Sequence, residues 1–207
     1  MVKGKDMEKN IADKRLFIFD AGGVTIKNID FSKELCSTYG IDYNEFWDDY
    51  SKYEFPMFEG VVTEEMYLRH LENKFNIRID GDPIREYFRP TINEEIRDII
   101  KRLKDRGYRV VLGSNTIKDH TEVMTEMGAL DLFDELYCSD RMGLSKPGRF
   151  FFEYILNREG VTAEDAFFTD DRLDYIEGAI RVGIDTLHYT GDDKSRKLRE
   201  TFSFLYN

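Results

Sequence analysis

Side chains suited to phosphate chemistry stand at the ends of apolar runs, or shortly beyond them, at four places in this 207-residue sequence. The four stretches are "LFIFDAGG" with Asp20, "VVLGSN" with Ser114 and Asn115, "SKP" with Lys146, and "FFTDD" with Asp170 and Asp171. Carboxylates gathered at one spot repel one another unless a cation neutralises them, and Mg²⁺ is a hard cation that prefers oxygen ligands. With Mg²⁺ and a phosphate in place, Asp20 is free to attack phosphorus and form an aspartyl phosphate, which water would hydrolyse.

The glycines after the first aspartate and the donors in the other stretches suit a phosphate ligand. Gly22 and Gly23 allow a sharp turn and a close approach of backbone N–H groups to an anion. Ser114 and Asn115 can donate further hydrogen bonds, and Lys146 adds a positive charge. The residue types therefore predict a site that holds a small phosphorylated ligand together with Mg²⁺.

Five short apolar runs are expected to be the strands that carry these residues. They cover residues 15–20, 108–113, 135–139, 165–170 and 185–189. Unbroken apolar runs, as opposed to alternating ones, are typical of a parallel sheet that is covered on both faces. Because ligands of open α/β sheets bind beyond the carboxyl ends of the strands, the four stretches are expected to meet there.

Helical periodicity fills the intervals between the later runs. One helix is expected after Asn93, its predicted N-cap, with a stop at Gly107, and two further helices are expected to end at Gly160 and near Gly183. Alternating strands and helices predict a doubly wound α/β fold.

The interval between the first and second runs is far longer than a crossover requires. The sequence of this interval shows helical periodicity and is rich in aromatic residues, which predicts a small helical cap over the sheet. The expected division is a flexible, solvated tail over residues 1–14, a catalytic core over 15–27 and 92–207, and a cap over 28–91.

Composition excludes several classes of partner. The formal net charge is −11, which disfavours nucleic acid and anionic membranes, because binding them needs clustered Lys and Arg. The sequence shows neither a transmembrane span nor an apolar segment for a signal peptide, and its two cysteines lack metal-site spacing. A cytoplasmic protein is expected, and the sequence does not distinguish a monomer from a dimer.

In their order and spacing, the four stretches resemble the haloacid dehalogenase superfamily over residues 15–189. "FDAGG" is similar to its first motif, with Asp20 as the nucleophile, and "GSNT" to its second, with Ser114 as the phosphate-binding hydroxyl. "SKP" places the superfamily's lysine at Lys146, and "FFTDD" resembles its acidic fourth motif. The resemblance implies a Rossmann-like core with an inserted helical cap.

The resemblance also implies roles for individual residues. Mg²⁺ would be held by the Asp20 carboxylate, the Gly22 carbonyl and Asp171, with Asp170 binding directly or through water. The catalytic residues would be Asp20 and Lys146, and the substrate's phosphate would be bound by Ala21, Gly22, Ser114, Asn115 and Lys146. The most similar branch includes bacterial α-glucose-1-phosphatases, so the expected substrate is a small phosphorylated metabolite, with sugar phosphates among the candidates.

Two positions depart from the superfamily's usual pattern. Most of its phosphatases carry an acid-base aspartate two residues after the nucleophile, where this chain has Gly22. Loss of such a group typically costs about 10² to 10⁴ in rate, so turnover is expected to be slow unless the leaving group needs little help or another group substitutes. Tyr175 stands where an Asp or Asn usually supports the metal, and its neighbour Asp174 is expected to compensate.

Two alternatives to a phosphatase remain open at this point. A dehalogenase that attacks carbon with Asp20 would need no acid at Gly22, but Asp170 and Asp171 count against it. A catalytically weak protein that binds a phosphorylated ligand would also explain Gly22. Outside the motifs, His120 and the cap residues Phe58 and Glu59 are further candidates for contact with the substrate.

Overall fold

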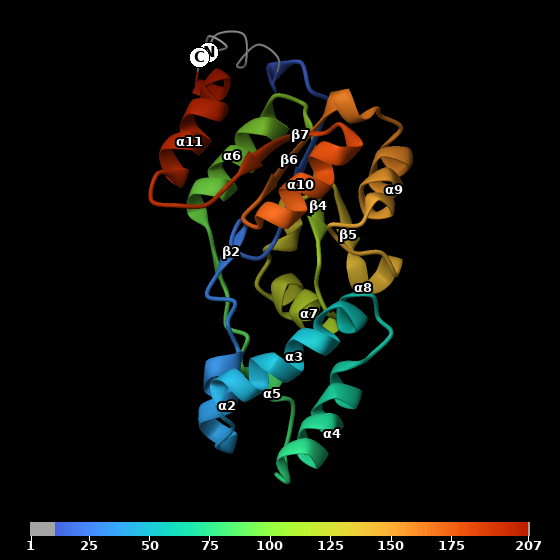
Figure 1. The fold of residues 1–207 in the computed structure, drawn as a ribbon. Helices are drawn as coiled ribbons and strands as arrows, with labels where there is room; N and C mark the ends of the chain where they lie inside the picture. The colour runs from blue at the N-terminus through green and yellow to red at the C-terminus, as the bar shows by residue number, and fades with distance from the viewer. Residues whose placement is uncertain (1–10, 207) are drawn as a thin grey trace.

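The five apolar runs form one parallel sheet. In a computed structural model that describes residues 11–206, the sheet has the order β5-β4-β1-β6-β7 (Figure 1). Its strands are β1 (Leu16–Phe19), β4 (Arg109–Ser114), β5 (Glu135–Cys138), β6 (Ala166–Asp170) and β7 (Asp185–His188). Central β1 is parallel to both of its neighbours, with Phe19 level with Leu112 on β4 and with Thr169 on β6. The carboxyl ends of β4, β1 and β6 therefore lie side by side, and the predicted doubly wound fold is confirmed.

Helices cover both faces of the sheet, which explains why the strands are apolar without alternation. On one face, Phe17 and Val110 share a buried cluster with side chains of α6 (Glu94–Asp105) and α11 (Lys194–Thr201). On the other, Ile18 and Val111 pack with side chains of α9 (Arg149–Glu159) and α10 (Leu173–Val182). The remaining core elements are α7 (Lys118–Glu126), η1 (Leu130–Leu132), α8 (Ser139–Met142), η2 (Ala163–Asp165) and η3 (Ser203–Tyr206).

The predicted helix ends agree with the structure, with one difference in mechanism. Gly160 and Gly183 end α9 and α10 with φ of 65° and 98°, in the left-handed region that favours glycine. Asn93 precedes α6 as predicted, but its side chain does not cap the helix. Its Nδ2 instead donates to the Val24 carbonyl at 2.8 Å and to the Tyr189 hydroxyl at 3.2 Å, so Asn93 ties the start of α6 to the core.

The long interval after β1 contains a group of helices at one end of the molecule, beyond the sheet (Figure 1). They are α2 (Ser32–Tyr39), α3 (Tyr43–Phe58), α4 (Glu64–Phe75) and α5 (Pro83–Tyr87). The chain leaves and re-enters the core through β2 (Ile26–Lys27) and β3 (Thr91–Ile92), which pair antiparallel. These four helices occupy the segment predicted to be the cap, and we refer to them as the cap helices.

The last residues of the expected tail are packed against the core. Residues 1–10 lie outside the described part of the chain, but Ile11 is buried in the main apolar cluster. Lys14 is also buried, and its Nζ lies 2.6 Å from Asp185 Oδ2 and donates to the Glu164 carbonyl at 2.6 Å. A lysine stem can be covered by apolar neighbours while its ammonium group is paired, so residues 11–14 differ from the solvated tail expected there.

Across residues 11–206, no helix combines the length and the apolar character that crossing a bilayer would require.

Candidate active site

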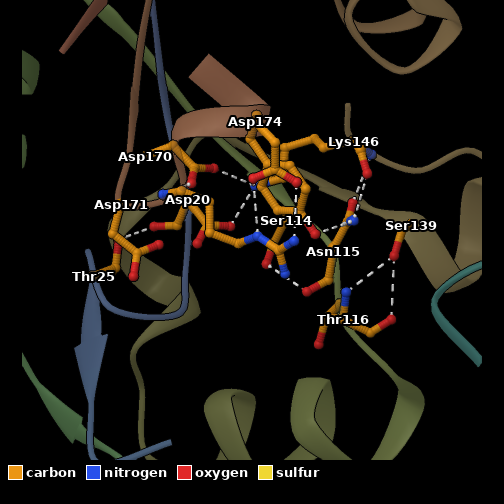
Figure 2. A network of polar contacts seen from close by, with 12 residues as sticks. Asp20, Thr25, Ser114, Asn115, Thr116, Ser139, Lys146, Asp170, Asp171 and Asp174 are labelled. Carbon is orange, nitrogen blue, oxygen red and sulfur yellow. Dashed lines mark hydrogen bonds and ion pairs between the residues drawn. The ribbon is translucent and has the colours of Figure 1, made fainter. Parts of the chain in front are cut away.

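The ends of β1 and β6 bring three aspartates together. Asp20 directly follows β1, Asp170 is the last residue of β6, and Asp171 follows it. One carboxylate oxygen from each of the three lies within 4.8 Å of the other two (Figure 2). Because β1 and β6 are adjacent and parallel, their carboxyl ends place these side chains at the same edge of the sheet.

Lys146 is the cation beside this cluster. Its side chain is 0% exposed, and its Nζ lies 2.6 Å from Asp20 Oδ1 and 2.7 Å from Asp170 Oδ2. Burial alone would lower the pKa of the Lys146 ammonium, but the carboxylates of Asp170 and Asp20 raise it above its usual value. Lys146 therefore remains charged and bridges the two carboxylates.

One ammonium group does not balance three carboxylates. Burial raises the pKa of Asp170 and of Asp171, and the charge of Asp20 adds to the rise in both. A further positive charge would relieve this repulsion, and a cluster of carboxylate oxygens suits a hard divalent cation. Asp20, Asp170 and Asp171 are thus the described residues that could hold a metal ion.

The glycines after Asp20 let the loop pass close to this cluster. Gly23 has φ of +71°, and a Cβ atom there would lie 2.1 Å from Asp171 Oδ2, so a side chain at this position would displace the carboxylate. A Cβ at Gly22 would lie 3.0 Å from Ile29 Cδ1, at the tip of a flexible side chain. Ile29 therefore occupies space beside the position where an acid-base aspartate would be expected.

Asn115 holds the backbone of Lys146. Its Oδ1 accepts a hydrogen bond from the Lys146 N–H at 2.8 Å, and its Nδ2 donates to the Lys146 carbonyl at 2.9 Å and to the Tyr175 hydroxyl at 3.0 Å (Figure 2). The sequence predicted that this side chain would bind phosphate, whereas the structure engages it with protein groups. Ser114, the last residue of β4, is buried, and its Oγ donates to the Asn115 carbonyl in a long bond of 3.3 Å.

The loop that carries Lys146 also depends on a glycine in α10. A Cβ at Gly178 would lie 2.7 Å from the Pro147 carbonyl oxygen and 2.9 Å from Pro147 Cβ. The absence of a side chain at Gly178 lets the residue after Lys146 lie directly against α10. Nothing in the sequence connects Gly178 with the site, because the two segments meet only in the folded chain.

Tyr175 and the neighbouring Asp174 have different partners in the structure. Tyr175 is buried, and its ring centre lies 4.9 Å from Lys146 Nζ, so it packs against the bridging ammonium. Asp174 is bound by Arg172, whose Nη2 lies 2.9 Å from Asp174 Oδ2. Asp174 is thus paired with Arg172 and its support of a metal stays a prediction, whereas Tyr175 packs against Lys146.

Two contacts from α3 and its C-terminal end reach the loops of the site, and the sequence did not predict either. Ser145, the residue before Lys146, donates from its Oγ to Glu59 Oε1 at 2.6 Å. Arg172, the residue after Asp171, has its Nη1 at 3.9 Å from Glu54 Oε1. In the sequence, only the positions of Ser145 and Arg172 beside the motifs hinted at these contacts. Their partners on the cap side are more than eighty residues away along the chain.

A pocket of about 310 Å³ lies between the strand ends and the cap helices. Ala21, Gly22, Ser114 and Asn115 line its end nearest the aspartates. The rest of its wall is mainly apolar and includes Ile29, Phe31, Trp47, Tyr50, Phe58 and Phe88. Of the sequence's further candidates, Phe58 and His120 line the pocket, whereas Glu59 bonds to Ser145.

Comparison with known proteins gives a consistent family. A sequence model described as "Hydrolase: haloacid dehalogenase-like hydrolase" matches residues 14–183. Among curated proteins, the chain is similar to the sesquiterpene phosphatase astK of Aspergillus oryzae, with 26% identity over 182 residues. This match covers 84% of this chain and 88% of that protein.

Solved structures show the same fold. A HAD-like family hydrolase from Porphyromonas gingivalis superposes with a TM-score of 0.72 at 24% identity, covering 84% of this chain and 90% of that one. A HAD family enzyme from Bacteroides thetaiotaomicron, solved as a magnesium complex, superposes with a TM-score of 0.77 at 22% identity. That match covers 90% of this chain and 99% of that one.

Proposed function

Because this chain belongs to the haloacid dehalogenase-like hydrolase family, we propose that it is a Mg²⁺-dependent phosphatase that acts on a small phosphorylated metabolite. The observation that carries the proposal is the buried bridge of Lys146 to Asp20 and Asp170, with Asp171 in the same cluster. It combines a nucleophile, a fixed cation and a set of oxygen ligands beside one end of the pocket. The curated relative named as a sesquiterpene phosphatase and the magnesium complex of the Bacteroides enzyme support it.

Asp20 is the proposed nucleophile. Its carboxylate attacks the phosphorus of the ester, the bond from phosphorus to the alcohol oxygen breaks, and an aspartyl phosphate forms. The alcohol takes up a proton from solvent water as it leaves, and a water molecule then attacks phosphorus, which releases inorganic phosphate and regenerates the Asp20 carboxylate. Lys146 keeps the Asp20 carboxylate oriented throughout, because its Nζ contacts one carboxylate oxygen at 2.6 Å.

Other residues bind the phosphate and the metal in this proposal. Ser114 and the backbone N–H groups of Ala21 and Gly22 donate to the phosphate oxygens, while Asn115 fixes Lys146. Mg²⁺ would be held by Asp20, Asp170, Asp171 and the Gly22 carbonyl, and it would offset the negative charge of the phosphate. The excess of carboxylates over cations in this buried cluster fits that ion.

The acidic cluster distinguishes the proposed phosphatase from a dehalogenase, and the release of phosphate distinguishes it from a protein that only binds its ligand. A dehalogenase has no use for two further carboxylates beside Asp20, so Asp170 and Asp171 favour the phosphatase. A protein that only binds a phosphorylated ligand would keep the cluster and would release no phosphate. Gly22 is the observation in favour of that second candidate, because it leaves the leaving group without the usual acid.

Phosphate release tests the proposal. The purified chain should release phosphate from p-nitrophenyl phosphate in the presence of Mg²⁺, and activity should be lost with EDTA and restored by added Mg²⁺. Asp20→Asn should abolish the activity, while Asp192→Asn, at an exposed position away from the site, should retain it. Equal activity in Asp20→Asn would exclude Asp20 as the nucleophile, and halide release from 2-chloropropionate without Mg²⁺ would favour the dehalogenase.

A further inference from the structure

We infer that the pocket beside Asp20 receives the apolar body of the substrate, so that the enzyme prefers phosphate monoesters of largely apolar alcohols over sugar phosphates. The inference rests on the proposed phosphatase function and specifies its substrate class. It departs from the sugar phosphate that the sequence suggested. It is carried by the wall of the pocket, by the hydrogen bonds already made by its polar residues, and by Ile29.

The pocket begins at the site and continues between apolar walls. Ala21, Gly22 and Ser114 line the end where the phosphate is proposed to bind. Beyond them, Phe31 and Phe88 contribute buried aromatic rings, at 5% and 4% exposure. An ester whose phosphate lies at the aspartates would therefore project its alcohol portion among aromatic side chains.

Three polar side chains of the wall, those of Asp30, Thr116 and Asn115, already bond to protein groups. The Asp30 carboxylate accepts hydrogen bonds from the Ser32 N–H at 3.1 Å and from the Ser32 hydroxyl at 2.5 Å. The Thr116 hydroxyl donates to the Ile117 carbonyl at 3.3 Å. Asn115 is held by Lys146 and Tyr175. The hydroxyl groups of a sugar would lose water here and find few replacement partners, which disfavours their binding.

Ile29 extends the apolar wall to the reacting end of the pocket. Its Cδ1 lies 3.0 Å from the position that a Cβ of Gly22 would take. An aspartate at position 22 would present a polar group to the leaving oxygen, whereas Gly22 with Ile29 presents a methyl group. The pocket is therefore apolar beside the phosphate as well as at its far end.

The ring of His120 also lines the pocket. Its ring stacks on Phe88, with centroids 3.8 Å apart, and meets Phe31 edge-on at 5.5 Å. Within the described residues its Nε2 is buried and has no hydrogen-bond partner. Because this nitrogen is covered, it offers the hydroxyl groups of a substrate no exposed hydrogen-bond partner.

Turnover of two matched esters tests the preference. Benzyl phosphate and glucose 6-phosphate are both esters of primary alcohols, so they differ mainly in the polarity of the alcohol portion. We expect kcat/KM for benzyl phosphate to exceed that for glucose 6-phosphate by about tenfold or more. A higher value for glucose 6-phosphate would overturn the inference and leave the proposed phosphatase function intact.

Binding gives a readout that does not depend on turnover. Trp47 is the single tryptophan of the chain and lines the pocket, so its fluorescence reports occupancy. In the presence of Mg²⁺, benzylphosphonate should change this fluorescence and bind at least about tenfold more tightly than methylphosphonate, measured in parallel by calorimetry. Equal affinities would overturn the inference. Tighter binding of benzylphosphonate without phosphate release from any ester would overturn the proposed function and keep the apolar assignment of the pocket.

Substitutions in the wall of the pocket test whether its apolar side chains cause the preference for benzyl phosphate. Phe58→Ser and Ile29→Ser should each lower the ratio of kcat/KM for benzyl phosphate to that for glucose 6-phosphate. Phe150→Ser is the matched control, because Phe150 lies on α9, is 70% exposed and does not line the pocket. Since Ile29 is itself 38% exposed, its replacement should leave the fold intact, and an unchanged ratio in both wall variants would contradict the inference.

Discussion

Asn115 binds both backbone polar groups of Lys146, accepting from its N–H at 2.8 Å and donating to its carbonyl at 2.9 Å. The side chain of Lys146 in turn reaches Asp20 and Asp170. The end of β4 therefore fixes the lysine that joins the ends of β1 and β6. We therefore propose that Asn115 positions Lys146, while the phosphate contact expected from the sequence stays a prediction.

Asn115→Ala should lower kcat by about 10²-fold with little change in KM, because a small displacement of Lys146 misaligns Asp20. Steady-state kinetics with p-nitrophenyl phosphate would measure the change. Asn157→Ala, at an exposed position on α9, serves as the control. If Asn115 instead contacted the phosphate directly, Asn115→Ala would raise the inhibition constant of inorganic phosphate and leave kcat nearly constant. That result would contradict the positioning role.

Gly23→Ala should weaken Mg²⁺ binding by about tenfold or more, because the new Cβ would lie 2.1 Å from Asp171 Oδ2 and displace that carboxylate. Calorimetric titration with Mg²⁺ would measure the affinity. Gly40→Ala is a matched control for backbone strain, since Gly40 has a similar φ of +67° and open space around its Cβ position. If the two variants bound Mg²⁺ with the same affinity, Asp171 would not be a ligand.

Gly22→Asp should reduce the dependence of the rate on the leaving group. Without an acid beside the leaving oxygen, kcat/KM should fall steeply as the pKa of the alcohol rises. An aspartate at position 22 would donate that proton once the tip of Ile29 moves, and it should raise the rate for alkyl esters most. A series of aryl and alkyl phosphates would give the slope of log kcat/KM against the pKa of the alcohol for the wild-type chain and for Gly22→Asp. Equal slopes in the two proteins would indicate that another group already supplies the proton.

His120 should reduce stability at acidic pH. Burial lowers its pKa from 6.5 to about 3, so between these values the unfolded chain binds a proton that the folded chain does not. The free energy of unfolding should therefore fall as pH decreases below about 6.5. His120→Phe should make this decline shallower in urea unfolding, and NMR titration of the wild-type chain should show His120 neutral down to about pH 4. Protonation of His120 near pH 6 would contradict this account.

The sheet could be predicted from the sequence because its signals are local. Unbroken apolar runs marked each strand, and Gly160 and Gly183 marked helix ends through their own backbone conformation. The meeting of Asp20 with Asp170 and Asp171 followed from the parallel order of β1 and β6. Each of these inferences needed only short-range pattern and the general geometry of α/β sheets.

The contacts that the sequence did not predict depend on the paths of loops. The bonds of Asn115 to Lys146 depend on the folded position of that residue. Arg172 meets Glu54 only because the fold brings α3 next to the loop after β6. Lys14 is packed because Asp185, far away in the sequence, supplies its counter-charge. Pairings of this kind leave no periodic trace in the sequence.

A covalent phosphoryl group on Asp20 is the most direct test of the proposed mechanism. The chain would be mixed with p-nitrophenyl phosphate and Mg²⁺, quenched in acid during a single turnover, digested and mapped by mass spectrometry. We predict a transient phosphoryl group on the peptide that contains Asp20, formed and lost at rates compatible with kcat, and absent in Asp20→Asn. Release of p-nitrophenol with no phosphoryl group on Asp20, or with the group on another residue, would contradict the account.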